Sequence, residues 1–421
     1  MNLKVNHIIS HGNTSVKSAG ILLMLLFVFV ATQAQVDTKF WFVAPEISND
    51  HADRPIYFNI TTFDQPAQVK ISMPTNASFP DINLTINANS THRENLTSYI
   101  DIVENMYRTD YDLSIPGKND NGILIESDVD ITVYYESAGP NNSDLFALKG
   151  RNALGSHFFT PFQNRYYNNS KSGWDDPAYS AFDIVFTEDN TYITLNIPAG
   201  QAVYNNGTGW TGTVRLGPFN RGETFSGIPV WMTNGIKPNK NANDVFGRVA
   251  QDHLSGLEIK AHDISGSKTK RIAVTLKDDS MRGFMGSAYD TGGDQIVPVD
   301  IIGKEYIALK GELRNGSVGG HYSKPPAPNS AEQEAVFITA TANNTSITVR
   351  GSIETTIDKG ETYTLELKHD NTHILASEPV YVWQVTGFGD EMGSAILPAI
   401  DRCTGSQKVA FTRSQSGWDF Y

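Results

Sequence analysis

A pair of alternating apolar segments that occurs three times constrains this chain more than any other feature of its 421 residues. In each copy, apolar and polar residues alternate, a turn rich in Asp, Asn, Gln or Pro follows, and the alternation resumes. Alternation with period two is typical of half-buried β-strands. Equivalent apolar residues are 11 positions apart each time, in the pairs Phe58 and Val69, Phe182 and Ile193, and Val336 and Ile347. Because turn geometry and the buried face fix strand register, the equal spacing predicts one β-hairpin shared by three units.

Two further elements follow each pair in the same order. Arg221–Phe225 matches Lys359–Tyr363, and the first unit offers a weaker counterpart at Arg93–Leu96. Apolar residues two positions apart then occur at Ile131 and Val133, Ile272 and Val274, and Val380 and Val382. Long helical periodicity is hard to find after residue 35. We therefore expect an all-β fold of tandem β-sandwich-like repeats of antiparallel sheet, with a barrel or radial arrangement as the alternative.

Each unit closes on a glycine: Gly155, Gly303 and Gly405. The expected units are 36–155, 156–303 and 304–405, each of ordinary domain size. The middle unit carries a loop insertion near 231–252 that is rich in Asn, Lys and Gly. Residues 406–421 resemble either the start of a further unit or a closing strand, and the favoured interpretation is a chain that is the N-terminal part of a longer protein.

The N-terminus resembles a secretory signal peptide over residues 1–34. It has two lysines and no acid, an apolar run from Ile21 to Val30, and small residues before an expected cleavage after Ala34. Ten apolar residues are too few to span a bilayer, which needs about 20, although an uncleaved anchor or a core segment is the alternative. No later stretch reaches spanning length. We expect a secreted or cell-surface protein with no transmembrane segment in the mature chain.

The charge excludes some partners. Removal of residues 1–34 lowers Lys plus Arg from 33 to 31 against 46 Asp plus Glu, so the mature chain carries −15. Such a surface repels phosphate backbones and anionic lipids, and we predict no nucleic-acid partner.

Cys403 is the single cysteine, so it has no disulfide partner in this sequence. A small buried apolar residue is favoured over a reactive thiol or a link to an absent segment. We assign it no catalytic role.

The chain resembles the family named for the N-terminal domain of the IgG Fc-binding protein. The segments that carry the resemblance are Lys39–Glu46, Asp189–Leu195, Lys359–Tyr363, Ser377–Val382, Leu397–Pro398 and Cys403–Gly405. The resemblance implies a secreted, non-enzymatic, β-rich module in a surface or mucus-associated protein. Bacterial relatives often carry a surface-sorting region after such modules. Immunoglobulin binding, which the family name suggests, is not carried over to this chain, because no residue motif for it is matched.

General catalytic motifs are absent from the sequence. Gly207–Gly212 spells G-x-G-x-x-G, but Thr213–Leu216 after it is typical of a strand, whereas a dinucleotide site needs a helix there. We expect a hairpin or loop at this position. A Walker P-loop, H-E-x-x-H and G-x-S-x-G are missing.

A carbohydrate-active hydrolase is the runner-up function. Asp175 and Asp176 beside Trp174 could supply paired carboxylates, which a glycosidase needs facing each other. Because consecutive strand residues point to opposite faces, a solvated loop is the favoured interpretation.

Cofactors are not expected, with calcium left as an option. Asn119–Gly122 and Thr291–Asp294 supply oxygen ligands on expected turns, but neither completes an EF-hand loop, and turn chemistry accounts for both. The spacing of His51, His253 and His262 defines no zinc site.

Aromatic residues of the middle unit are the best ligand-binding candidates: Tyr166, Tyr167, Trp174, Tyr179, Trp210 and Trp231. Aromatic faces on loops stack on sugar rings or anchor a protein partner, since they bury a large area at low entropic cost. The alternative is that they fill the core. We predict a non-enzymatic adhesion or ligand-binding module for an extracellular glycoprotein, mucin or polysaccharide, with a structural spacer as the third possibility.

Overall fold

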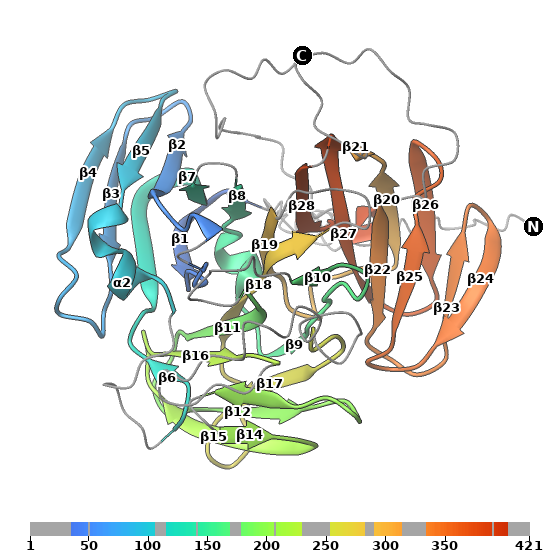
Figure 1. Ribbon diagram of the computed structural model, residues 1–421. Coiled ribbons are helices and arrows are strands. Elements are labelled where there is room, and N and C mark those ends of the chain that lie inside the picture. Colours follow the sequence, from blue (N-terminus) through green and yellow to red (C-terminus); the bar gives the residue numbers. More distant parts are fainter. Residues whose placement is uncertain are drawn as a thin grey trace, which may run out of the picture. The chain divides into compact units, whose positions relative to one another are not determined.

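The computed structural model describes residues 35–402 except 49–50, 106–114, 140–141, 169–177, 206–207, 230–252, 283–289, 314–333 and 390. Residues 33–421 form one compact unit. Strands dominate it, and the helices are short: η2 (Thr97–Tyr99), α2 (Ile100–Val103), η3 (Gly150–Ala153) and η5 (Ile400–Arg402). The fold is all-β and mainly antiparallel, as the sequence predicts (Figure 1).

The strands fall into three sandwiches, which we call first, middle and third. The first contains β1 (Asp37–Phe42), β2 (Ile56–Thr62), β3 (Ala67–Ser72), β4 (Ile82–Ile86), β5 (Thr91–Asn95), β7 (Ile123–Gly139) and β8 (Asn142–Ala147). The middle contains β9 (His157–Phe159), β10 (Tyr167–Asn168), β11 (Ser180–Phe186), β12 (Thr191–Asn196), β13 (Val203–Asn205), β14 (Thr208–Trp210), β15 (Thr213–Phe219), β16 (Thr224–Gly227), β17 (Glu258–His262), β18 (Ile272–Arg282) and β19 (Asp290–Ile296). The third contains β20 (Glu305–Leu309), β21 (Glu312–Leu313), β22 (Ala335–Ala340), β23 (Thr345–Val349), β24 (Ser352–Ile357), β25 (Thr362–Glu366), β26 (Asn371–Ala376), β27 (Val380–Gly389) and β28 (Glu391–Ile396).

One strand order repeats in all three. The middle sandwich has sheets β16-β11-β18-β19 and β15-β12-β17-β9, and the third has β25-β22-β27-β28 and β24-β23-β26-β20. In the first, the 17-residue β7 serves both sheets: up to Ser127 it pairs with β3 and with most of β1, and from Ile131 onward it pairs with β2 and β8, with Asp37 of β1 also opposite Ile131. The repeat predicted from the sequence is therefore present at the level of topology, while the exact unit boundaries remain a prediction.

The predicted shared hairpin is wrong. β11 pairs with β16 and β18, whereas β12 pairs with β15 and β17, so the two strands do not pair with each other. β22 and β23 are separated in the same way. Their apolar residues, including Phe182 and Ile193, meet in one core. The constant spacing of 11 therefore marks a turn that crosses from one sheet to the facing sheet, and alternation alone cannot distinguish this from a hairpin.

The second repeated element is a turn followed by an edge strand. The N–H groups of Thr62, Phe186 and Ala340 donate to the carbonyl oxygens of Ser90, Glu223 and Glu361. Preceding residues Asn89, Gly222 and Gly360 have positive φ. The counterpart in the first sandwich is thus Asn89–His92 and not Arg93–Leu96, because Asn can replace Gly at a left-handed position and hides the motif.

Alternating residues build the cores. Ile56, Phe58 and Ile60 of β2 are buried in the first core, and Val336 and Ile338 of β22 in the third. Phe337 and Trp383, which project from the opposite face of the third sandwich, belong to the core cluster of the middle one. Burial of both faces of a sheet explains why β11, β19 and β22 are apolar or buried throughout.

Successive sandwiches meet where a glycine of one lies against the carbonyl of a turn glycine in the next. Gly122 precedes β7 and donates its N–H to the Gly222 carbonyl at 3.1 Å, and Gly256 precedes β17 and lies against the Gly360 carbonyl. We call the Gly122–Gly222 contact the first joint and the Gly256–Gly360 contact the second joint. At the first joint, β6 (Lys118–Asn119) also pairs antiparallel with β16 of the middle sandwich.

Three other sequence expectations concern local structure. Of the Gly207–Gly212 segment, Thr208–Trp210 forms β14, which pairs with β13, and strand β15 follows at Thr213, so the prediction of a strand in place of a dinucleotide-binding helix is confirmed. The predicted signal peptide, residues 231–252, Cys403 and residues 406–421 lie outside the described residues. In the described part of the chain, no helix is long and apolar enough to cross a membrane.

Candidate binding groove

A groove of about 830 Å³ lies where the loop after β9 meets the edge of the third sandwich. Asn164 and Arg165 form one wall. The third sandwich supplies the remaining lining, Val349, Arg350, Glu354, Tyr363, Thr364, Leu365, Glu366, Lys368, His369 and Thr372. Because successive strand residues point to opposite faces, four consecutive lining residues from β25 show that the groove follows the edge of that strand.

The alternation of hydrogen bonds along β25 determines which of its backbone groups face outward at this edge. The Leu367 N–H donates to the Glu334 carbonyl, and the Ala340 N–H donates to the Glu361 carbonyl. Pairing in this register alternates, so the backbone groups of Tyr363 and Leu365 face β22, and those of Thr362, Thr364 and Glu366 face outward. β25 pairs with β22 and with no other strand in the described ranges.

Charged groups of both signs line the groove, but the acids are already engaged. Arg165 and Glu366 form an ion pair of 3.1 Å between Nη2 and Oε1. The Tyr363 hydroxyl donates to Glu354 at 2.9 Å, and burial together with this carboxylate raises the pKa of Tyr363. Arg350 donates to the Asn371 carbonyl at 3.1 Å. Arg350 and Lys368 form no ion pair with an acid among the residues described, and they outnumber Glu354, whose partner Tyr363 is neutral, so the net charge of the groove is positive.

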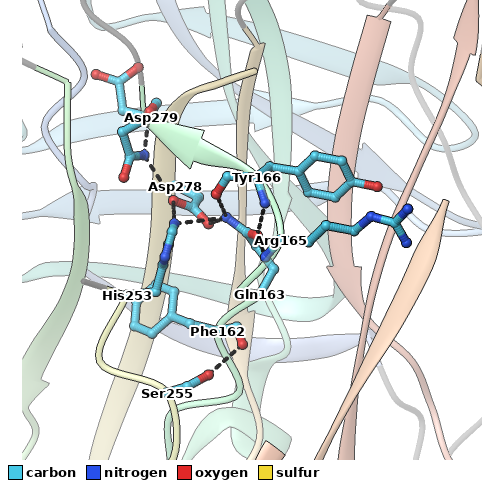
Figure 2. A network of polar contacts seen from close by, with 9 residues as sticks. Phe162, Gln163, Arg165, Tyr166, His253, Ser255, Asp278 and Asp279 are labelled. Atoms are coloured by element: carbon cyan, nitrogen blue, oxygen red, sulfur yellow. Dashed lines mark hydrogen bonds and ion pairs between the residues drawn. The ribbon is translucent and has the colours of Figure 1, made fainter. Parts of the chain in front are cut away.

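A buried amide holds the loop that forms one wall (Figure 2). The Gln163 side-chain oxygen accepts the N–H groups of Arg165 and Tyr166 at 2.8 and 2.7 Å. Its Nε2 lies 2.7 Å from the Tyr166 carbonyl oxygen, and 2.8 Å from both Asp278 Oδ2 and His253 Nε2. In Figure 2, the Arg165 and Tyr166 side chains extend away from His253. All polar groups of the Gln163 side chain are therefore used to fix the segment that carries Arg165 to the groove.

The network continues into the first sandwich. Asn168 donates to Asp278 Oδ1 at 2.9 Å, and the neighbouring Asp279 contacts His51 Nδ1 at 2.7 Å and accepts the Ser48 N–H at 2.9 Å. Although burial opposes the charge of Asp279, these bonds keep its pKa below the usual value. Buried charges of this kind are retained only with such partners.

A direct hydrogen bond joins the two walls of the groove. The Thr364 hydroxyl donates to Asn164 Oδ1 at 2.6 Å, across 200 residues of sequence. Arg165, Arg350 and Lys368 were not singled out by sequence reasoning, because they come from separate loops. Only the repeated Lys359–Tyr363 element pointed to this strand, and it indicated a structural role.

The predicted aromatic residues are not gathered at one described surface. Tyr166 is fully buried, and burial raises its pKa. Tyr179 is buried, contacts the Lys277 ammonium at 3.7 Å and donates to Glu46 at 2.9 Å. Trp210 packs partly buried against the middle core. Tyr167 lies in β10, opposite Arg282. Trp174 and Trp231, like Asp175 and Asp176, are outside the described residues, and the ligand-binding role of the six aromatics stays a prediction.

The two segments considered for calcium have other roles, and both were wrongly expected to be turns. Asn119 lies in β6, and Asn121 donates its amide to the Ile102 and Glu104 carbonyls. Thr291–Asp294 lies within strand β19, where Asp294 pairs with Lys149. Among the described residues, no group of three His, Cys, Asp or Glu side chains could hold a metal ion.

The model of a known family, described as IgGFc binding protein, matches residues 146–414. This chain belongs to that family. The match includes the middle and third sandwiches, both walls of the groove and five of the six segments that suggested the resemblance, while Lys39–Glu46 lies outside it. The search of curated proteins found no match. Family membership supports a binding module, and the groove lies wholly within the matched residues.

Proposed function

We propose that this protein is a secreted or cell-surface adhesion module that binds an extracellular glycoprotein, mucin or polysaccharide without catalysis. The observation that carries the proposal is the groove along β25, which is open, polar and built from two sandwiches of the family-matched region. Its walls are held by the Gln163 network and by the Thr364–Asn164 bond. A preformed site of this kind loses little entropy when it binds a partner.

Secretion is part of the proposal. It is supported by the basic start, the apolar run from Ile21 to Val30 and the small residues that end at Ala34. Detection of a new N-terminus after Ala34 in exported protein would support it. Retention of residues 1–34 in protein recovered from the cell interior would contradict it.

The binding proposal is tested with a groove-filling variant and its neighbour. Glu354→Trp places an indole in the groove, whereas Ile353→Trp adds the same group one residue earlier, where the side chain is 75% exposed and does not line the groove. The chain without residues 1–34 is immobilised and exposed to mucin, immunoglobulin Fc and a polysaccharide panel. We expect retention of at least one ligand, weakened at least tenfold by Glu354→Trp only. No retention above an unrelated β-sandwich, or equal effects of both variants, would contradict the proposal.

A further inference from the structure

The chain contains its own example of an occupied edge at the position equivalent to β25. β16 of the middle sandwich corresponds to β25, since Gly222 and Gly360, and Glu223 and Glu361, make the same turn hydrogen bonds. On β16, the outward N–H of Ser226 donates to the Gly117 carbonyl at 3.1 Å. Thr224 and Phe225 of β16 pair with β6, which runs antiparallel. The equivalent edge in this chain is therefore covered by an added strand.

The same groups on β25 have no acceptor in the described part of the chain. Thr362 and Thr364 correspond to Thr224 and Ser226, and the N–H groups of Thr362, Thr364 and Glu366 face away from β22; of these residues, Thr364 and Glu366 line the groove. Unpaired edge groups are a ready template for another extended segment. The groove leaves space for such a segment beside the strand, because it is lined by consecutive β25 residues.

From this geometry we infer that β25 binds an extended, acidic peptide segment of a partner protein as an added antiparallel strand. The inference rests on the proposed binding function and names its partner. The hydrogen bonds would come from the outward groups of Thr362, Thr364 and Glu366, as in other cases of strand addition. The acidic preference follows from the net positive charge of the groove. Arg350 and Lys368 have no acidic partner among the described residues, Arg165 pairs with Glu366, and Glu354 alone is left with a neutral partner, the Tyr363 hydroxyl.

A matched pair of substitutions isolates the backbone contribution. Thr364→Pro removes the outward N–H, while Thr364→Val keeps it, and both remove the hydroxyl bond to Asn164. The probe is a blocked decapeptide of alternating Glu and Val, measured by fluorescence anisotropy, with a Lys-and-Val peptide as the charge control. We expect binding of the Glu peptide only, weakened at least tenfold by Thr364→Pro and much less by Thr364→Val. Equal weakening by both variants would overturn the inference.

Charge reversal and amide exchange test the wild-type edge directly. Lys368→Glu should weaken the Glu peptide at least tenfold, and Lys268→Glu, at an exposed turn distant in sequence, should not. In the wild-type chain, the peptide should slow hydrogen exchange at the Thr362, Thr364 and Glu366 amides. Protection of these amides in the free protein would overturn the inference by showing an occupied edge. So would a polysaccharide that binds the groove with these amides unaffected, although the proposed binding function would then stand.

Discussion

The two joints between sandwiches share a close approach of two glycines but differ in what covers the neighbouring edge strand. At the first joint, β6 pairs with β16, and Lys118 forms a buried ion pair of 3.0 Å with Glu223. At the second joint, Lys359 is 41% exposed and pairs with Glu258 at 3.0 Å, and β25 has no further strand partner in the described residues. The first joint is therefore closed, because another strand covers its edge strand, and the second joint is open. The groove lies at the open joint.

The largest loss of stability is expected from substitution of the glycines that lie in close contact at both joints. A Cβ on Gly256 would lie 1.8 Å from the Gly360 carbonyl oxygen, and φ is +76°. Gly256→Ala should therefore lower the free energy of unfolding by more than about 3 kcal/mol, from backbone strain and displacement of the joint. Gly122→Ala meets the Gly222 oxygen at 2.4 Å and should cost somewhat less. Urea denaturation measures both, and a loss below about 1 kcal/mol for Gly256→Ala would show that the joint is not close-packed.

Removal of the joint lysine should lower the stability of the protein more at the first joint than at the second. Lys118→Ala breaks the buried ion pair with Glu223, which costs about 3 kcal/mol. Lys359→Ala removes a half-exposed partner from Glu258, which keeps His157, Lys260 and Asn196, so the loss should be below about 1 kcal/mol. Equal losses in urea denaturation would contradict the distinction between a closed and an open joint.

Proline at equivalent positions of β16 and β25 tests whether β16 is covered by another strand and β25 is not. Ser226→Pro removes the N–H that bonds Gly117 and crowds β6, so we expect a loss of about 2 kcal/mol or more. Thr364→Pro removes an N–H with no acceptor in the described residues and the hydroxyl bond to Asn164. Because edge strands tolerate proline, the loss should be about 1 kcal/mol, mostly from that hydroxyl bond. Thermal unfolding of both variants measures this, and a reversed order would show that β25 is the covered edge.

The smallest effect concerns pH at the first joint. Asp183 accepts a hydrogen bond from Asn105, which also accepts one from Thr224 of β16, and burial raises the pKa of Asp183 to about 7. A raised carboxyl pKa favours the protonated folded state, so this stability is complete below the unfolded pKa of about 4 and is lost as pH rises through 7. Unfolding free energy should fall by roughly 2 kcal/mol between pH 5 and pH 8. Asp183→Asn should flatten that slope, and an unchanged slope would assign it to other groups.

The sequence predicts the all-β class and the threefold repeat because alternation survives in β2, β11 and β22 despite different packing. It does not predict which strands pair, because a hairpin and a crossing between sheets require the same alternation on either side of a turn. Asn89 in place of glycine also hid one copy of the turn motif. These limits concern pairing, which is set by contacts distant in sequence.

The groove could not be predicted from the sequence for a related reason. Asn164 and Thr364 are 200 residues apart, and neither segment contains a pattern that predicts contact with the other. The aromatic pattern around Tyr166 drew attention to the correct loop, but Tyr166 itself is buried and the neighbouring Arg165 lines the groove. Aromatic composition cannot separate a residue that fills a core from one that faces a partner.

Native-state hydrogen exchange of the free protein tests the central comparison most directly. The amide of Ser226, bonded to Gly117 on the covered edge, should exchange slowly, and that of the equivalent Thr364 should exchange quickly. Tyr363, whose amide faces β22, is the internal control and should be protected. Fast exchange at Thr364 with slow exchange at Ser226 and Tyr363 is the predicted result. Equal protection of Thr364 and Ser226 would contradict the account of one closed and one open joint.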